Sequence, residues 1–181
     1  MEKSILGRSE PNPKKLVLIT DTSVLINFLI VDLVPKLVQL SGYEFWITDH
    51  VVNEISDHYD TQLGRLLTAI KNGQLREISV NSLPEVEQFA KLTKLGLGVG
   101  ECSAMSVAIT RGHHIAIDDK TAIKRLLAIT TAVDVFTTSD LVILLIQQAI
   151  ITVDYADKIK LEWEQQYRFK LPFTSFSEKF R

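Results

Sequence analysis

The most constraining feature of this 181-residue sequence is an apolar stretch that ends in an aspartate. Residues 16–20 lack the apolar–polar alternation of a half-exposed strand, which predicts a strand buried on both faces of a parallel sheet. Asp21 follows directly and can cap the apolar helix predicted to begin near Ser23. Because parallel sheets bind ligands at the carboxyl ends of their strands, Asp21 is expected at a functional edge.

Strand-like and helix-like segments alternate along the rest of the chain. This alternation predicts a three-layer α/β/α fold with a central, mostly parallel sheet. We expect a flexible N-terminal arm over residues 1–13, one domain over 14–150, and a C-terminal helix and tail over 151–181. The last part is expected to pack on the domain or on a partner. Asp32 is expected to cap a second helix over 33–41.

Composition narrows the possible partners and the compartment. The net charge is −2 and the isoelectric point is near 6.1, so any binding of nucleic acid must rest on a local basic patch. Cys102 is the only cysteine, which excludes an internal disulfide and fits a reducing cytoplasm. The apolar runs fall well short of the roughly 20 residues of a membrane span, so no membrane insertion is expected.

Acidic residues occupy comparable places along the predicted fold, either directly after a strand or in the first turns of the helix that follows one. They are Asp21, Glu54, Glu101, Asp118 and Asp119. In a parallel sheet the carboxyl ends of the strands and the amino ends of the following helices share one edge. We therefore expect these carboxylates to meet in one pocket.

A pocket of carboxylates favours a divalent cation. Neighbouring carboxylates repel one another and raise each other's pKa values, and a bound cation relieves that repulsion. Ligand sets made only of oxygen select Mg²⁺ or Mn²⁺. Two such ions can activate a water and stabilise the leaving oxygen of a phosphodiester. Each acid alone has a plainer interpretation as a helix cap, a turn residue or a solvated charge.

Segments around these acids resemble the PIN domain family, in order and at plausible spacing over roughly residues 15–150. They are 21–26 (DTSVLI), 51–55 (VVNEI), 98–104 (GVGECSA) and 115–122 (IAIDDKTA). The resemblance implies a metal-dependent ribonuclease, as in the VapC-type toxins of prokaryotic toxin–antitoxin pairs. It places Mg²⁺ or Mn²⁺ on Asp21, Glu54, Glu101 and at least one of Asp118 and Asp119. It also implies an RNA substrate, a small antitoxin partner and a homodimer.

Further candidates surround the acids. Four hydroxyl side chains could hold the ligands or their waters in place: Thr22, Ser23, Thr138 and Ser139. Their competing interpretation is helix capping, and Thr138 or Ser139 is expected to cap the helix that begins near residue 140. Three cations beyond the fourth acid could contact phosphate: Lys120, Lys124 and Arg125. Their competing interpretation is an ordinary solvated helix face.

Two alternatives stay open. The first is a PIN-like binding or scaffold module without catalysis, which the acids disfavour because an unused acidic cluster costs folding free energy through charge repulsion. The second concerns the late aromatic stripe at Trp163, Tyr167, Phe169, Phe173 and Phe176. It is either ordinary packing of the last helix or a partner surface.

Overall fold

The computed structural model describes residues 15–180, so the expected arm over residues 1–13 lies outside the described residues. Within them, a five-stranded sheet forms the centre, in the order β3-β2-β1-β4-β5. All of its neighbouring strands pair in parallel. The strands are β1 (Leu16–Thr20), β2 (Tyr43–Thr48), β3 (Arg76–Ile78), β4 (His114–Ala116) and β5 (Val135–Phe136). The predicted three-layer α/β/α fold with a parallel sheet is confirmed.

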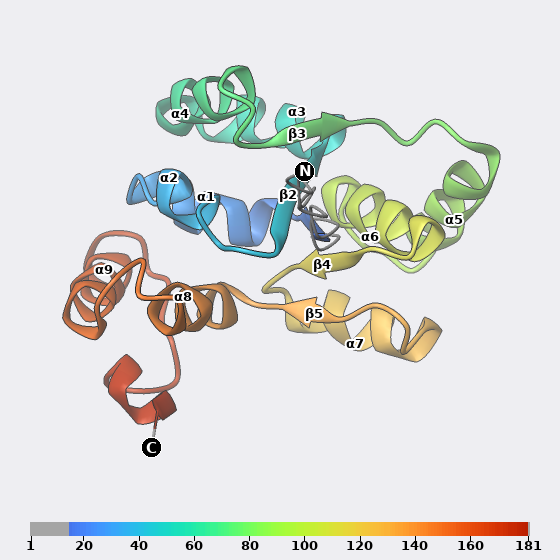
Figure 1. Cartoon of the computed structure of the whole chain (residues 1–181). Coiled ribbons are helices and arrows are strands. Elements are labelled where there is room, and N and C mark those ends of the chain that lie inside the picture. Colours follow the sequence, from blue (N-terminus) through green and yellow to red (C-terminus); the bar gives the residue numbers. More distant parts are fainter. Residues whose placement is uncertain (1–14, 181) are drawn as a thin grey trace, which may run out of the picture.

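Helices cover both faces of this sheet (Figure 1). The first of them are α1 (Thr22–Ile30), α2 (Val34–Leu37), α3 (Asp49–His58), α4 (Asp60–Lys71) and α5 (Leu83–Thr93). The later ones are α6 (Val99–Arg111), α7 (Lys120–Ile129), α8 (Thr138–Gln147) and α9 (Val153–Gln166), followed by a short 3₁₀ helix, η1 (Phe176–Phe180).

The central strand β1 divides the core into two clusters. Leu18 belongs to the cluster on the side of α1, α4, α8 and α9, and Ile19 belongs to the cluster on the side of α5, α6 and α7. Both side chains are fully buried. Successive side chains of a strand point to opposite faces, so a strand that is buried on both sides must be apolar throughout. This explains the uninterrupted apolar run that leads to Asp21.

The predicted second helix was wrong in both extent and cap. Helix α2 covers only Val34–Leu37, and its N-cap residue Leu33 makes no side-chain capping bond. Asp32 has φ +52° and instead closes α1, since its N–H donates to the Leu29 carbonyl and that of Leu33 donates to the Phe28 carbonyl. This is the left-handed termination that commonly ends a helix.

The C-terminal helix packs on the sheet domain. Trp163 of α9 is fully buried, and its indole Nε1 donates to the Asn27 carbonyl at 2.9 Å. Its ring also meets Phe28 edge-on, with centroids 6.5 Å apart. Trp163 is therefore core packing, whereas Tyr167 at the end of the helix is 41% exposed. Among residues 15–180, no helix is both long and apolar enough to cross a membrane.

Candidate functional site: a carboxylate cluster at the sheet edge

Asp21 lies at the point where β1 passes into α1, as its N-cap residue. Its Oδ2 accepts hydrogen bonds from the backbone N–H of Ser23 at 3.1 Å and from the Ser23 hydroxyl at 2.8 Å. Its Oδ1 is buried and has no hydrogen-bond partner in the described part of the chain. Burial, and to a lesser degree the charges of Glu101 and Glu54, raise the pKa of Asp21 to about 6. Asp21 thus carries a buried carboxylate oxygen that the fold itself leaves unsatisfied.

Glu54 reaches the same place from α3. Its Oε2 accepts a hydrogen bond from the Thr22 hydroxyl at 2.9 Å. Gly100, in the first turn of α6, lies directly against this oxygen, and a Cβ added at Gly100 would collide with Glu54 Oε2. The glycine therefore allows α6 to approach α3 closely enough to bring the two helix starts together.

Glu101 enters the cluster from the first turn of α6. Its Oε2 accepts a hydrogen bond from the backbone N–H of Gly98 at 2.9 Å, which satisfies one of the free donors at the start of the helix. The side chain is only half-buried, and its charge raises the pKa of Asp21. The helix-cap interpretation is correct for Glu101, and it does not remove the carboxylate from the vicinity of Asp21.

Asp118 joins the cluster through shared hydrogen bonds. Its Oδ1 accepts from the backbone N–H of Thr138 at 2.8 Å, and its Oδ2 accepts from the Thr138 hydroxyl at 2.6 Å and from Asn27 Nδ2 at 3.1 Å. Its own backbone N–H donates to the Ser23 hydroxyl at 3.0 Å, and that hydroxyl donates to Asp21. Burial raises the pKa of Asp118 against the opposing effect of these bonds. Ser23 is therefore the link between the ends of β1 and β4.

The structure separates the two adjacent aspartates. Asp119 is exposed and caps α7, with its Oδ1 accepting from the backbone N–H of Ala122 at 2.7 Å. Only Asp118 faces the hydrogen-bond network around Asp21. The choice of metal ligand between the two stays a prediction, and the contacts favour Asp118.

The hydroxyl residues at the start of α8 also have separate roles, since one caps the helix and another contacts Asp118. Thr137 caps α8 in a reciprocal pair with Asp140, so the predicted caps Thr138 and Ser139 were wrong. Because Thr137 takes the capping position, the buried Thr138 is free to hold Asp118. Ser139 lines a cavity beside Asp118 without a hydrogen bond to it.

Asn27 is the residue that the sequence analysis missed. It is 5% exposed, and its Nδ2 lies within 3.1 Å of acceptors on Asp118, Thr138 and the Ser23 carbonyl. The available clue was an amide inside an otherwise apolar helix, one helical turn after Ser23. Residues four apart share a helix face, so Asn27 must lie on the side of the acids.

The predicted phosphate-contacting cations lie around the start of α7. Lys120 is exposed and lines the same cavity as Asp118. Lys124 is exposed and Arg125 is half-buried, and neither lines that cavity. A second cavity, of about 460 Å³, lies on the other flank of the cluster and is lined by Glu54 and Gly100 among others. The cluster is thus open to ligands on two flanks.

The donor set fits a hard divalent cation. The functional atoms are all carboxylate and hydroxyl oxygens, and the unsatisfied Oδ1 of Asp21 is the natural first ligand. As they stand, the described residues contain no group of three or more His, Cys, Asp or Glu side chains arranged to hold a metal ion. The full ligand set of Asp21, Glu54, Glu101 and Asp118 therefore stays a prediction.

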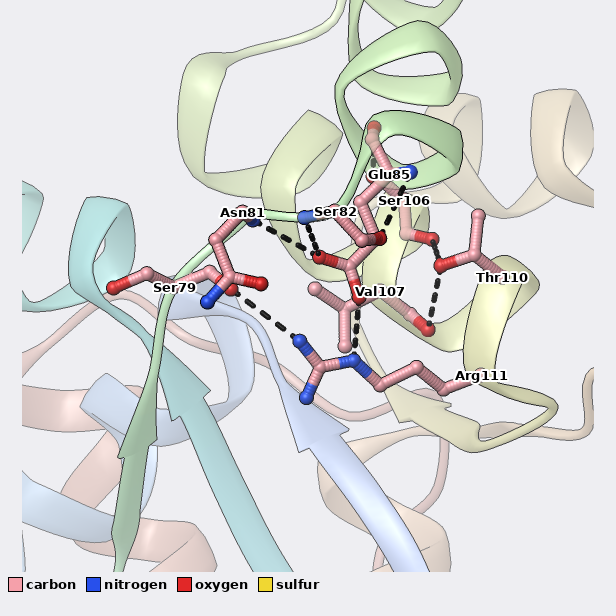
Figure 2. A network of polar contacts seen from close by, with 8 residues as sticks. All are labelled: Ser79, Asn81, Ser82, Glu85, Ser106, Val107, Thr110 and Arg111. Atoms are coloured by element: carbon pink, nitrogen blue, oxygen red, sulfur yellow. Dashed lines mark hydrogen bonds and ion pairs between the residues drawn. The ribbon is translucent and has the colours of Figure 1, made fainter.

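A contrasting buried carboxylate lies at the other end of α6 (Figure 2). Glu85 is 2% exposed, forms an ion pair with Arg111, and accepts hydrogen bonds from the backbone N–H groups of Asn81 and Ser82 at 3.0 and 3.2 Å. Arg111 in turn donates to the Ser79 carbonyl. The Arg111 hydrogen bond is the main reason that the pKa of Glu85 falls to about 2.

The parallel sheet and the acids at its carboxyl edge define an α/β domain suited to metal-assisted chemistry on phosphates. The family model described as DUF3368, PIN domain, matches residues 17–169. This chain therefore belongs to the PIN domain family. PIN domains are in general nucleases that use divalent metals, so the class of activity is hydrolysis of nucleic acids.

Solved structures of similar fold come from several organisms. A PilT N-terminus domain protein, SSO1118, from the hyperthermophilic archaeon Sulfolobus solfataricus P2 is 18% identical, with a TM-score of 0.46 over 70% of this chain and 90% of that chain. PAE2754 from Pyrobaculum aerophilum is 16% identical, with a TM-score of 0.49 over 75% and 91%. A chain of VapBC2 from Rickettsia felis, in a structure bound to a DNA fragment from the VapBC2 promoter, is 14% identical. Its TM-score is 0.47 over 67% of this chain and 98% of that chain. No curated protein sequence matches the chain.

Proposed function

We propose that this PIN domain is an endoribonuclease that depends on Mg²⁺ or Mn²⁺ and hydrolyses phosphodiester bonds of RNA. The observation that carries the proposal is the buried, unpartnered Oδ1 of Asp21 beside two further carboxylates. A fold does not normally bury a carboxylate oxygen without a partner, because the unsatisfied oxygen costs free energy. Binding of a cation at Asp21 would explain why the fold tolerates this cost in free energy.

Asp21, Glu54, Glu101 and Asp118 would hold the cation, and Asp119 would serve mainly as a helix cap. When bound, the metal supplies a Lewis acid for a phosphate oxygen and lowers the pKa of a coordinated water. The remaining work belongs to the chain. Ser23 keeps Asp21 and Asp118 in register, and Thr22 holds Glu54 in place through their hydrogen bond.

Asn27 and Thr138 act as positioning residues for Asp118. Both donate to its Oδ2, and the backbone N–H of Thr138 donates to its Oδ1. These bonds stabilise the ionised carboxylate and fix its orientation, which matters because small misplacements in a catalytic site reduce rates strongly.

The direct test is a cleavage assay with single-stranded RNA and single-stranded DNA of the same sequence. The purified full chain is incubated with Mg²⁺ or Mn²⁺, with EDTA, or as the Asp21→Asn variant. We expect RNA cleavage that requires metal and is lost in the variant. Cleavage of DNA alone would contradict the RNA assignment. Binding without cleavage at any metal concentration would support a scaffold module instead.

We further propose that the chain acts in the cytoplasm as the toxin of a toxin–antitoxin pair and forms a homodimer. If so, expression of the wild-type chain should arrest bacterial growth, and expression of Asp21→Asn should not. A small co-encoded partner that restores growth would be the antitoxin. Unimpaired growth at confirmed expression of the active enzyme would contradict the toxin role. A monomeric mass by light scattering would contradict the dimer.

A further inference from the structure

A cavity of about 520 Å³ opens beside Asp118, on the flank of the acid cluster away from Glu54. One wall comes from the starts of α7 and α8, including Asp118 and Lys120, and the other comes from the chain that follows α9. Sites for small ligands commonly have volumes of about 300–1,000 Å³. The cavity is therefore large enough for one nucleotide unit, and one of the proposed metal ligands, Asp118, lines it.

The charge of the lining is positive although the whole chain has a net charge of −2. Lys120, Lys170 and Lys179 line the cavity and all three are exposed, and Asp118 is the one acid among the lining residues. Within residues 15–180, none of these lysines forms an ion pair with a carboxylate. Cations gathered without acidic partners attract anions such as phosphate.

The wall formed by the C-terminal chain also carries two half-buried aromatic rings. Phe169 meets Trp163 edge-on with centroids 5.5 Å apart, and Phe173 meets Phe176 in the same way at 4.9 Å. Lys179 Nζ lies 4.5 Å from the centre of the Phe173 ring. Aromatic surface for a base and cations for a backbone are the combination by which proteins bind single-stranded nucleic acid.

Hydrogen bonds within the chain hold this wall in place without a ligand. The Asp157 carboxylate accepts hydrogen bonds from the Ser175 hydroxyl at 2.6 Å and from the backbone N–H of Phe176 at 2.8 Å. The Phe176 side chain is fully buried and belongs to the core cluster that includes Trp163 of α9. These contacts hold the tail against α9, so binding needs little additional ordering, which favours affinity.

We propose that this cavity is the subsite for a nucleotide of single-stranded RNA adjacent to the scissile phosphate. Its base packs against Phe169 and Phe173, and its phosphates contact Lys120, Lys170 and Lys179. The inference rests on the proposed nuclease function, since it takes Asp118 as the boundary to the reacting phosphate. A single strand is required because a base stacked inside a duplex cannot enter such a cavity.

The test is binding of a short fluorescein-labelled RNA strand in EDTA, measured by anisotropy as a function of salt. The variant is Lys170→Gln with Lys179→Gln, and the matched control is Lys91→Gln with Lys158→Gln, two exposed lysines outside the cavity. We expect the cavity variant to bind roughly tenfold more weakly. The slope of log affinity against log salt should fall in magnitude by about 1.4, since each phosphate contact on a single strand contributes about 0.7.

The control variant should bind RNA like the wild-type chain. The single variant Lys170→Glu provides a second test, because it leaves the contact between Lys179 and the Phe173 ring intact. In cleavage assays the cavity variants should raise KM with little change in kcat. Unchanged RNA binding in the cavity variants would overturn the inference and leave the nuclease proposal standing. Weakened binding in a chain that never cleaves would show that the cavity binds RNA, but it would refute the nuclease and with it the place of the cavity beside a scissile phosphate.

Discussion

Two carboxylates in this domain have the same small exposed fraction, and they differ in depth and in the groups that surround them. Asp21 and Glu85 are each 2% exposed. Glu85 has a guanidinium partner in Arg111 and two backbone N–H donors, and its pKa falls to about 2. Asp21 has only Ser23 as a hydrogen-bond partner, one unsatisfied oxygen and two acidic neighbours. Its pKa rises to about 6, chiefly because deep burial disfavours the charged carboxylate.

The difference distinguishes a buried carboxylate that the fold itself stabilises from one that we propose to bind a cation. The ion pair with Arg111 compensates the desolvation of the Glu85 carboxylate, and it joins α5 to the end of α6 (Figure 2). The Asp21 carboxylate is compensated only at Oδ2, by Ser23, and its buried Oδ1 is a net cost unless a cation completes the site. Burial alone therefore does not identify a functional acid, whereas burial without compensation does.

The largest expected effect is on cleavage by Asp21→Asn. The amide can still cap α1, but it loses the negative charge of a metal ligand, so kcat/KM should fall by about a thousandfold or more. The measurement is RNA cleavage at saturating Mg²⁺. Glu85→Gln provides the comparison, because its activity per folded molecule should stay at the wild-type level.

Glu85→Gln should be the most destabilising of these variants. Loss of the charge leaves Arg111 without its ion-pair partner, which should lower the free energy of unfolding by about 2–3 kcal/mol and Tm by roughly 5–10 °C. The matched control is Glu87→Gln, an exposed acid on the same helix. A Tm equal to that of the control would show that Glu85 contributes nothing beyond a surface charge.

The two acids should also affect the pH dependence of stability with opposite signs. Glu85 has a lowered pKa, so its contribution is present above about pH 4.5 and is lost as the pH falls toward about 2. Asp21 has a raised pKa, so its ionisation destabilises the fold as the pH rises from about 4 through about 6. In EDTA, Asp21→Asn should gain up to about 3 kcal/mol over the wild-type chain at pH 8 and lose that advantage near pH 4. Denaturant unfolding at both pH values measures the difference.

Gly100→Ala should displace Glu54, because the added methyl group collides with its Oε2. We expect a loss of activity of roughly 10²-fold, since a displacement of a ligand by about 1 Å is costly in catalysis. Gly64→Ala is the control, because Gly64 lies in α4 with open space around it. That variant should be fully active and slightly more stable, by about 0.5–1 kcal/mol.

The smallest effect is expected at Asp119. Asparagine caps helices as well as aspartate does, so Asp119→Asn should leave both Tm and cleavage nearly unchanged. Asp118→Asn brings an amide donor against the donors of Thr138 and Asn27, and should lose activity roughly tenfold to a hundredfold. If the two variants behave in reverse, Asp119 is the fourth ligand.

The fold was predictable because the constraint is local to the sequence. The apolar run that begins at residue 16 predicts a strand buried on both faces, and the alternation of strands and helices that follows leaves few other topologies. The end of α1 was not predictable in the same way. Asp32 looks like an N-cap, but two backbone hydrogen bonds that form only in the folded turn make it a helix terminator.

The site was predictable to the extent that topology alone determines it. Strand ends and helix starts share an edge, which was enough to bring Glu54 and Glu101 to Asp21. Lys120 was predicted from its place beside the fourth acid, but Lys170 and Lys179 were not predictable, because they lie in the chain that follows α9. Long-range side-chain bonds from Asp157 hold that chain in place, and no local pattern reports them.

The central claim is that the uncompensated Asp21 cluster binds a divalent cation. Its most direct test is titration of the metal-free protein with Mn²⁺. Calorimetry measures the heat of binding, and the electron paramagnetic resonance signal measures the Mn²⁺ that stays free. The account predicts saturable binding by the wild-type chain and by Glu85→Gln, and strongly weakened binding by Asp21→Asn. Equal Mn²⁺ affinity in the Asp21→Asn variant and the wild-type chain would contradict it.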